Sequence, residues 1–188
     1  MTIKEVELLT ITINDTPRVW IGCLACYNSG NLVGKWIDAD KAAAFVPCKR
    51  SEFGYPHEEF WVMDHENFNG FLSGECSPSE AQELYELMQE IEKDHDLDVV
   101  SAWLNKTSET LKDFDEDKFT SCYMGQFDSE RDFAEHWAES TVENYEEKEA
   151  NSVWPFNFID WDRATRDLMY SFTSVEDGNH GYFIFLDM

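Results

Sequence analysis

The sequence has few basic residues. Lysine and arginine together number 14 against 39 aspartates and glutamates, so the formal net charge is −25 at pH 7 and the sequence pI is about 4.3. A chain with this balance repels phosphate groups, which argues against proteins that bind nucleic acid or an anionic membrane surface directly. We therefore expect a basic protein partner, with no direct contact to nucleic acid or membrane.

Long apolar runs and an export signal are also lacking. No stretch approaches the roughly 18 consecutive apolar residues that a membrane span requires. The opening MTIKEVELLTITIND has no charged segment followed by the long apolar segment of a signal peptide. The five cysteines are an odd number, and without an export signal we expect reduced thiols in a cytoplasmic protein.

Motifs for binding a metal ion are incomplete. Cys23 and Cys26 form a CxxC pair, but they fall within a predicted strand, where residues i and i+3 face opposite sides. No second CxxC or CxxH follows to complete a zinc site, so we expect two small buried apolar side chains. His57 and His65 flank another predicted strand and do not form the helical HExxH of a zinc protease. We expect both to be surface or loop histidines, and no metal ion.

Catalytic patterns are missing as well. The acidic run that starts at Asp113 suggests a calcium loop, but Lys118 and Met124 occupy the positions where an EF-hand needs glycine and glutamate. A hydrolase that uses two carboxyl groups would need them convergent in a pocket, with one pKa raised, whereas helical periodicity places most acids of this chain outward. We expect no catalytic residue and no cofactor.

Most of the negative charge lies in the middle of the chain. The stretch from Glu75 to Glu149 holds 23 acidic residues and 6 basic ones. Because 43% of the residues are hydrophobic and 15% aromatic, the chain differs from a disordered acidic tail, and the charge is expected on folded structure. At one charge per about 1.7 Å of duplex, a net charge of −25 corresponds to roughly 42 Å of DNA, or about 12 base pairs.

Hydrophobic periodicity predicts an α+β fold. A capping box, Ser77-Pro78-Ser79-Glu80, marks one helix start especially clearly, since proline favours the first helical position. We expect strands at 18–27, 32–37, 58–64 and 118–127, helices at 38–46, from 78, at 97–106, 128–148 and 159–169, and a closing hairpin of 170–175 and 181–186.

Loops and composition divide the chain into three parts. The loop 67–74 is expected to separate an N-terminal α+β subdomain, 1–74, from an acidic helical subdomain, 75–117. The remaining residues, 118–188, are expected to form a C-terminal α+β subdomain. The sequence thus predicts three small subdomains.

The predicted helix 128–148 carries an unusual row of acids. Glu135, Glu139, Glu143 and Glu147 recur every four residues, so their carboxylates would stand roughly 6 Å apart along one side, with Asp132 extending the row. Like charges at this spacing destabilise an isolated helix by a few tenths of a kcal/mol per pair. Something other than helix stability should favour them. The helix itself is expected to be capped by Asp128 and to bury Phe133, Ala134, Trp137 and Tyr145.

The segment 27–36 reads Tyr27-Asn28-x-Gly30-x-Leu32-Val33-Gly34-x-Trp36. It resembles the opening YNxGxLxGxW pattern of the ArdA-type antirestriction proteins. Further blocks follow in the family's order, so the resemblance covers nearly the whole chain: 60–66, 121–139, Phe158-Ile159-Asp160-Trp161, Arg166-Asp167-Leu168 and Gly178-Asn179-His180-Gly181-Tyr182-Phe183.

The resemblance implies an elongated, curved homodimer of three-part chains whose carboxylates imitate the phosphates of bent B-form DNA. Such a protein occupies the DNA-binding groove in the methyltransferase core of type I restriction-modification enzymes and protects incoming mobile DNA. The expected phosphate-mimicking residues are Glu80, Glu83, Glu86, Glu90, Asp94, Asp113, Asp115, Glu116, Asp117, Asp128, Asp132, Glu135, Glu139, Glu143, Glu146 and Glu147. The family's dimer contact lies in its C-terminal part, which here suggests Trp154, Phe156, Phe158, Trp161 and Arg166.

Two other functions fit part of the sequence. An acidic adaptor or inhibitor of another basic DNA-binding protein would carry a similar charge. A carboxylate-using hydrolase is the other alternative, although an outward row of acids is unlike a catalytic pocket. Neutralising many acids outside one small pocket would spare a hydrolase and disable a mimic.

Overall fold

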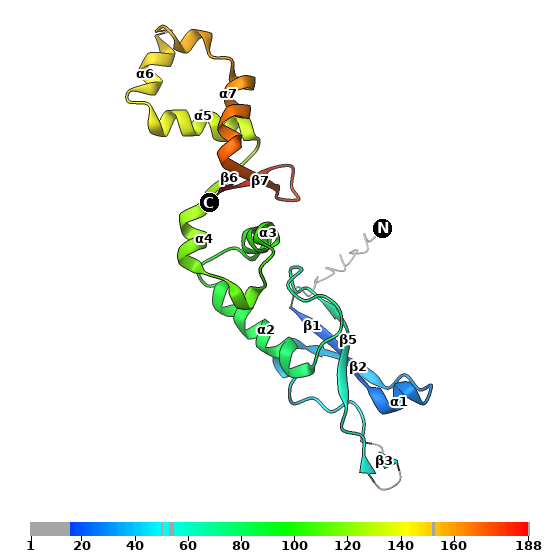
Figure 1. Ribbon diagram of the computed structural model, residues 1–188. Helices are drawn as coiled ribbons and strands as arrows, with labels where there is room; N and C mark the ends of the chain where they lie inside the picture. Colours follow the sequence, from blue (N-terminus) through cyan, green and yellow to red (C-terminus); the bar gives the residue numbers. More distant parts are fainter. Residues whose placement is uncertain (1–15, 50, 53–54, 152, 188) are drawn as a thin grey trace, which may run out of the picture. The chain divides into compact units, whose positions relative to one another are not determined.

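The computed structural model describes residues 16–49, 51–52, 55–151 and 153–187 (Figure 1). The chain divides into two compact units, Met1–Glu86 and Leu87–Met188. Helices and antiparallel strands occur in both, which confirms the α+β class. The opening residues considered for a signal peptide lie outside the described part, and the division into three subdomains stays a prediction.

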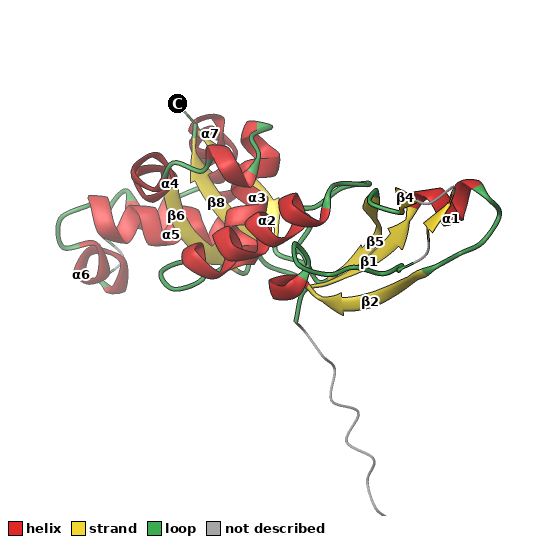
Figure 2. Ribbon diagram, turned by 90° about the horizontal axis from the view of Figure 1, so that it is seen from below, coloured by secondary structure: helices red, strands yellow, loops and turns green. Residues whose placement is uncertain are grey.

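The first unit is built on a three-stranded antiparallel sheet (Figure 2). Its strands are β1 (Arg18–Cys23), β2 (Gly34–Asp38) and β5 (Phe60–Glu66), in the order β2-β1-β5. Val19 and Ile21 on the central strand are fully buried, because strand alternation places both on the same face of the sheet. The predicted strands 32–37 and 58–64 are thus confirmed with their bounds shifted by about two residues.

The predicted strand 18–27 is wrong in its second half. β1 ends at Cys23, and a short helix follows, α1 (Leu24–Asn28). The backbone N–H of Ser29 donates to the carbonyl groups of Ala25 and Cys26, which closes this helix beyond its last residue. Five residues are too few for helical periodicity to show in a sequence.

Gly34 permits a close approach between β2 and a tryptophan of β1. A Cβ atom at this position would lie 2.4 Å from the ring of Trp20 and 2.6 Å from the carbonyl oxygen of Ile21. Trp20 pairs directly with Trp36 across the two strands. The glycine that precedes Trp36 by two residues therefore makes room for the ring of Trp20.

The other elements of the first unit are short. The predicted helix 38–46 is reduced to one 3₁₀ turn, η1 (Ala39–Lys41). Two strands of two residues each follow, β3 (Ser51–Glu52) and β4 (Tyr55–Pro56), which pair only with each other. The loop predicted at 67–74 is present before α2 (Pro78–Ile91).

The capping box at the start of α2 is confirmed. The hydroxyl oxygen of Ser77 accepts a hydrogen bond of 3.2 Å from the backbone N–H of Glu80, and the Glu80 carboxylate accepts one of 2.8 Å from the N–H of Ser77. Because these bonds satisfy donors that the helix leaves unpaired, Ser77→Ala should lower the free energy of unfolding by about 1 kcal/mol. Urea unfolding followed by circular dichroism measures this. Ser79→Ala, in the exposed first turn, is the control, and equal losses in the two variants would contradict a capping role.

The second unit begins with two helices in the predicted places, followed by a short turn. These are the end of α2, then α3 (Leu97–Thr107) and η2 (Leu111–Asp113). The predicted strand 118–127 is wrong in its first half, because Glu116–Cys122 forms the helix α4 and only Tyr123–Phe127 forms a strand, β6. The Asp115 side chain accepts from the N–H of Lys118 and so starts a helix that the residue types of KFTSC disfavour.

The long acidic helix predicted over 128–148 is two helices. They are α5 (Glu130–Thr141), capped by Ser129 rather than Asp128, and α6 (Tyr145–Ala150). Asn144 between them adopts the left-handed conformation, with φ of 55°, which no α-helix can continue through. The break also turns Tyr145 into the protein interior, where it is buried.

The chain closes with helix α7 and a hairpin. After η3 (Phe156–Phe158) come α7 (Trp161–Leu168) and η4 (Met169–Ser171). The hairpin consists of β7 (Phe172–Glu176) and β8 (Tyr182–Leu186), which confirms its prediction, and β8 also pairs with β6 to give the sheet order β6-β8-β7.

Both faces of β8 are buried. Ile184 packs with Phe133 of α5 and Phe172 of β7 in one apolar cluster. Phe185 points to the other face, where its ring lies 5.5 Å from that of Trp103 on α3. Burial on two faces explains why this strand reads as the continuous apolar run YFIFL, without the alternation of a half-exposed strand.

Candidate protein-binding surface

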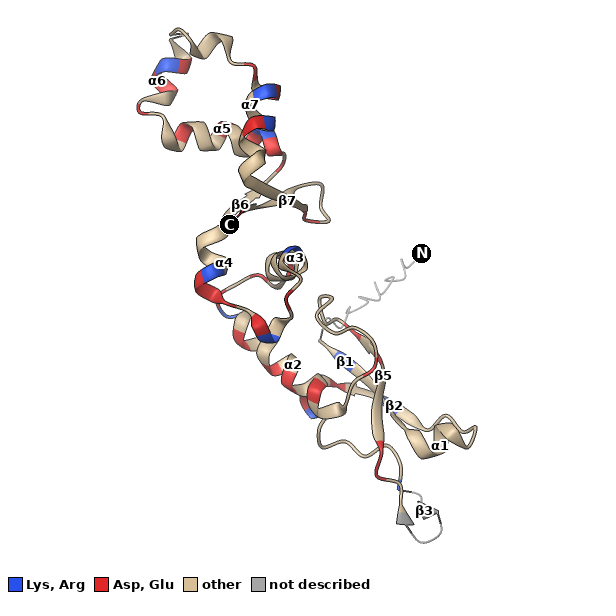
Figure 3. Cartoon of the chain, viewed as in Figure 1, with Lys and Arg blue, Asp and Glu red and all other residues tan. Residues whose placement is uncertain are grey.

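The exposed side of α2 carries the first group of predicted phosphate-mimicking residues. Ala81, Leu84 and Met88 face inward and are buried, and helical spacing therefore turns the glutamates of this helix outward. Glu80, Glu83, Glu86 and Glu90 are all exposed, as expected. Figure 3 shows the acidic residues along α2 in red.

Three of the predicted acids hold the starts of helices or turns. Asp113 completes a capping box at η2, and Asp115 accepts from a backbone N–H at the start of α4. Asp132 accepts a hydrogen bond of 2.7 Å from the hydroxyl of Ser129 at the start of α5. Negative charge is favourable at these positions because backbone N–H groups point toward it. These acids therefore contribute to folding as well as to surface charge.

The hydrogen bonds to Asp113 keep this residue charged. Its carboxylate accepts from the hydroxyl of Thr110 at 2.6 Å and from the backbone N–H of Thr110 at 3.2 Å. These contacts, the hydroxyl first, lower the pKa of Asp113 below its ordinary value. The carboxylate therefore stays ionised to a lower pH than that of an ordinary aspartate.

Three further acids have a basic or imidazole neighbour. Glu135, the only half-buried residue among those predicted, pairs with Arg131 at 2.7 Å. The carboxylate of Glu116 lies 3.1 Å from Nε2 of His95, and Glu90 pairs with Lys93. Exposed pairs of this kind are worth roughly 0–1 kcal/mol, so a more strongly charged partner can compete for these carboxylates.

The remaining acids of the second unit lie open to solvent. They belong to the loop after α2, to α4, to the turn before α5, and to α5 and α6. All are exposed, and their side chains have no hydrogen bond or ion pair within the part of the chain that the structure describes: Asp94, Asp117, Asp128, Glu139, Glu143, Glu146 and Glu147. These are the carboxylates most available to a basic partner.

The row of acids predicted along one helix is interrupted. Glu135 and Glu139 belong to α5, Glu143 lies in the turn, and Glu147 belongs to α6. The continuous ridge at roughly 6 Å intervals is therefore wrong beyond Glu139. The four carboxylates remain on neighbouring elements, but no single helix axis sets their spacing.

Many basic side chains are paired with acids of their own unit. Lys106 lies 2.9 Å from Asp187, and Lys118 lies 3.0 Å from Glu109. In the first unit Arg18 lies 3.3 Å from Glu66, and Lys41 lies 2.8 Å from Asp38. Since acids outnumber bases by 39 to 14, the charge left after this pairing is strongly negative.

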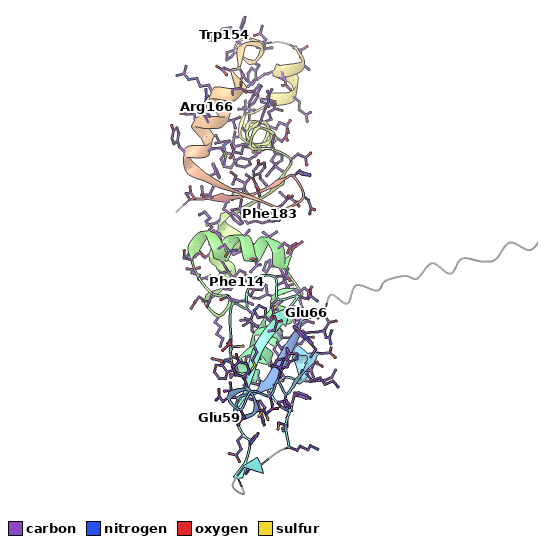
Figure 4. All side chains as sticks on the ribbon, turned by 90° about the vertical axis from the view of Figure 1, so that its right-hand side faces the viewer. Glu59, Glu66, Phe114, Trp154, Arg166 and Phe183 are labelled. Carbon is purple, nitrogen blue, oxygen red and sulfur yellow. The ribbon has the colours of Figure 1, made fainter. Side chains whose placement is uncertain are left out.

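The residues expected at a dimer contact differ in exposure. Trp154 and Phe158 are 77% and 74% exposed, which is unusual for large apolar side chains. Phe156 is half-buried, with its ring 5.5 Å from that of Tyr145, and Trp161 is also half-buried. Arg166 lies at the surface, and Figure 4 labels it together with Trp154.

One group of residues was missed from the sequence. Cys23 and Cys26 do not share a strand, because α1 turns the second cysteine back toward the first. Cys48 and His57 join them. His57 lies in the loop between β4 and β5, in line with the prediction of a surface or loop histidine, but its side chain is buried. The available signal was a CxxC pair followed by a further cysteine 22 residues after Cys26 and a histidine 31 residues after it.

Comparison with models of protein families gives a match. A family model described as "Antirestriction protein (ArdA)" matches residues 19–183. The match extends over most of both compact units and includes all of the predicted acids and the residues expected at the dimer contact. No curated protein matches the sequence. Among the described residues, no helix has the length and apolar character needed to cross a membrane.

Proposed function

We propose, from the premise that this chain belongs to the ArdA family of antirestriction proteins, that it acts by imitating B-form DNA. Its exposed carboxylates would occupy the positions of phosphates in the DNA-binding groove of a type I restriction-modification enzyme, within the methyltransferase core. Incoming mobile DNA in the cytoplasm would then escape restriction. No bond is made or broken in such a mechanism, so the protein need not be an enzyme.

The observation that supports this proposal most directly is the group of exposed, unpaired acids on the second unit. Groups that bind phosphate in an enzyme groove are lysine and arginine side chains and backbone N–H groups. Carboxylates accept hydrogen bonds from the same donors, and guanidinium groups bind both anions in a bidentate manner. A surface that offers many solvated carboxylates therefore suits a groove that binds DNA.

Competition with DNA tests the proposal. A type I methyltransferase core is bound to a fluorescent duplex that contains its target sequence, and the protein is titrated in at two salt concentrations. We expect stoichiometric displacement of the duplex, and weaker displacement at the higher salt concentration, because both reactions depend on the same charges.

The opposite result has a clear meaning. If the duplex stays bound at low salt and saturating protein, the DNA-binding groove is not the target of this chain. Recovery of a different basic DNA-binding protein in a pull-down would then favour the acidic adaptor.

We also propose a homodimer that uses the exposed aromatic residues of the C-terminal part. Trp154 and Phe158 resemble interface anchors, since large aromatic side chains dominate the binding free energy of many interfaces. Two chains of net charge −25 repel each other, so apolar contact must provide the attraction.

Replacing Trp154 by alanine should weaken this dimer. A central aromatic anchor is typically worth about 2 kcal/mol or more, which corresponds to a dissociation constant roughly 30-fold higher. Sedimentation equilibrium measures the constant, and raising the salt concentration should tighten the wild-type dimer by screening its charge. Tyr170→Ala, also at a highly exposed aromatic residue, is the matched control. Equal dimerisation of wild type and Trp154→Ala would exclude this contact.

A further inference from the structure

Four potential metal ligands converge in the first unit. Cys23 ends β1, Cys26 lies on α1, Cys48 lies in the segment before β3, and His57 lies between β4 and β5. Their relative exposures are 0%, 2%, 4% and 9%, so the group is closed to solvent. One ligand atom from each residue lies within 4.8 Å of all the others.

The distances within this group suit a tetrahedral ion. Sγ atoms of Cys26 and Cys48 lie 3.6 Å apart, and Nδ1 of His57 lies 3.3, 3.5 and 3.7 Å from the Sγ atoms of Cys23, Cys26 and Cys48. With Zn–S bonds of about 2.3 Å and Zn–N bonds of about 2.0–2.1 Å, the edges of a tetrahedron are roughly 3.8 Å between sulfur atoms and 3.6 Å between sulfur and nitrogen. An ion at the centre would require almost no movement of the four side chains.

The surroundings explain why an ion would be useful here. Within the described part of the chain, the partly buried apolar residues that pack against the three cysteines are Ala25, Val33 and Phe60. Three thiols and three such neighbours make a small core for a region made of loops and very short elements. Structural zinc sites occur where a core of this size cannot hold the chain by itself, because metal binding contributes directly to folding.

The burial of His57 points the same way. Nδ1 faces the three sulfur atoms, whereas Nε2 is buried without a hydrogen-bond partner among the described residues. The contacts on the sulfur side are therefore what holds the imidazole inside the protein. A neutral imidazole that coordinates through Nδ1 carries its proton on Nε2.

We infer that Cys23, Cys26, Cys48 and His57 bind one Zn²⁺ ion that ties α1 to the segment between η1 and β5. The three thiols release three protons to solvent on binding, so a neutral ligand set and Zn²⁺ become a site of net charge −1 with no change of oxidation state. All four ligands come from the protein, as in structural rather than catalytic zinc sites. This assignment stands independently of the proposed DNA mimicry.

Redox chemistry fits the group less well. The three thiols are buried, with exposures of 0% for Cys23, 2% for Cys26 and 4% for Cys48. Reactive cysteines instead have lowered pKa values and lie in positively charged, accessible surroundings. A disulfide between Cys26 and Cys48 would also leave Cys23 and His57 without a role.

Metal analysis of the purified full chain tests the inference. The protein is prepared under reducing conditions, without an affinity tag, and zinc and iron are measured by mass spectrometry. We expect one zinc ion per chain in the wild type and near zero in Cys26→Ser. Cys76→Ser, at a cysteine of the same unit that lies outside the group, should retain one zinc ion.

A second measurement uses only the wild-type chain, in case Cys26→Ser does not fold. Zinc is removed with a chelator and replaced by Co²⁺, whose absorption reports thiolate ligation and tetrahedral geometry. We expect strong thiolate-to-cobalt bands that vanish when one equivalent of Zn²⁺ is added. Absence of these bands, an iron content above the zinc content, a Cys26–Cys48 disulfide, or equal zinc in wild type and Cys26→Ser would each overturn the inference.

Discussion

Neutralising six of the exposed acids together is expected to raise the dissociation constant for a type I methyltransferase core about a hundredfold. The substitutions are Asp94→Asn, Asp117→Asn, Asp128→Asn, Glu139→Gln, Glu143→Gln and Glu147→Gln. An exposed ion pair is worth roughly 0–1 kcal/mol. Six pairs at about 0.5 kcal/mol each sum to around 3 kcal/mol of binding free energy. The duplex competition assay at low salt measures the loss.

The same positions provide the control for this experiment. Exchanging aspartate for glutamate, and glutamate for aspartate, at all six sites keeps the charge and changes the length of each side chain. We expect inhibition close to wild type, because a distributed electrostatic surface tolerates small shifts of its charges. The salt dependence should stay steep in this control and become shallower in the neutralised variant.

A single substitution gives the complementary result. Glu139→Gln alone should change the dissociation constant no more than a few-fold, since it removes one of many exposed carboxylates. If this change abolished inhibition, binding would depend on one specific contact and the mimicry proposal would fail. Unchanged inhibition by the variant with all six acids neutralised would also contradict the mimicry proposal.

Replacing Phe133 by alanine should lower the free energy of unfolding by about 3–5 kcal/mol. This side chain is 1% exposed, and its ring centroid lies 4.9 Å from that of Phe172 and 5.2 Å from that of Phe127. Truncation removes buried apolar surface and leaves a cavity between α5 and the sheet. Because small domains have a total stability of about 5–15 kcal/mol, this change removes a large part of it.

Urea unfolding followed by tryptophan fluorescence tests this expectation. Trp137 packs against Phe133 with ring centroids 5.9 Å apart, so its emission reports on the same cluster. Phe133→Leu keeps most of the volume and should cost less than about 1.5 kcal/mol. Tyr170→Ala, at an exposed aromatic residue, should cost under about 0.5 kcal/mol. A loss in Phe133→Ala no larger than in Tyr170→Ala would mean that α5 does not pack as described.

The elements that could be predicted from the sequence carry their own boundary signals. α2 begins with a capping box and proline, and β7 and β8 flank a turn that contains glycine and asparagine. The wrongly predicted elements have local causes that hydrophobic periodicity does not reveal. α1 is too short to show a pattern, α4 depends on one aspartate cap, and the end of α5 depends on the left-handed conformation of Asn144.

The candidate sites were predictable to different degrees. Charge and helical periodicity placed the acids on the surface correctly, and every one of them is exposed except Glu135. They could not separate the acids that cap helices from those that only carry charge, because the residue types are the same. The metal-ligand group was hidden for another reason: Cys48 and His57 come from loops far along the chain, and only the fold brings them to Cys23 and Cys26.

The acids that cap helices limit how sequences of this kind can diverge. Asp115 accepts from one particular backbone N–H group, and Asp132 accepts from the hydroxyl of the capping residue Ser129, so a shift of one residue along the chain would cost either contact. Glu139, Glu143 and Glu147 contribute only to the negative electrostatic potential of the surface, and an acid at a neighbouring position can make the same contribution. In related chains, the acids that only carry charge should therefore move freely between neighbouring positions, whereas the acids that hold helix starts should stay in place. Two such surfaces could then have similar electrostatic potentials and differ in most of their acidic positions.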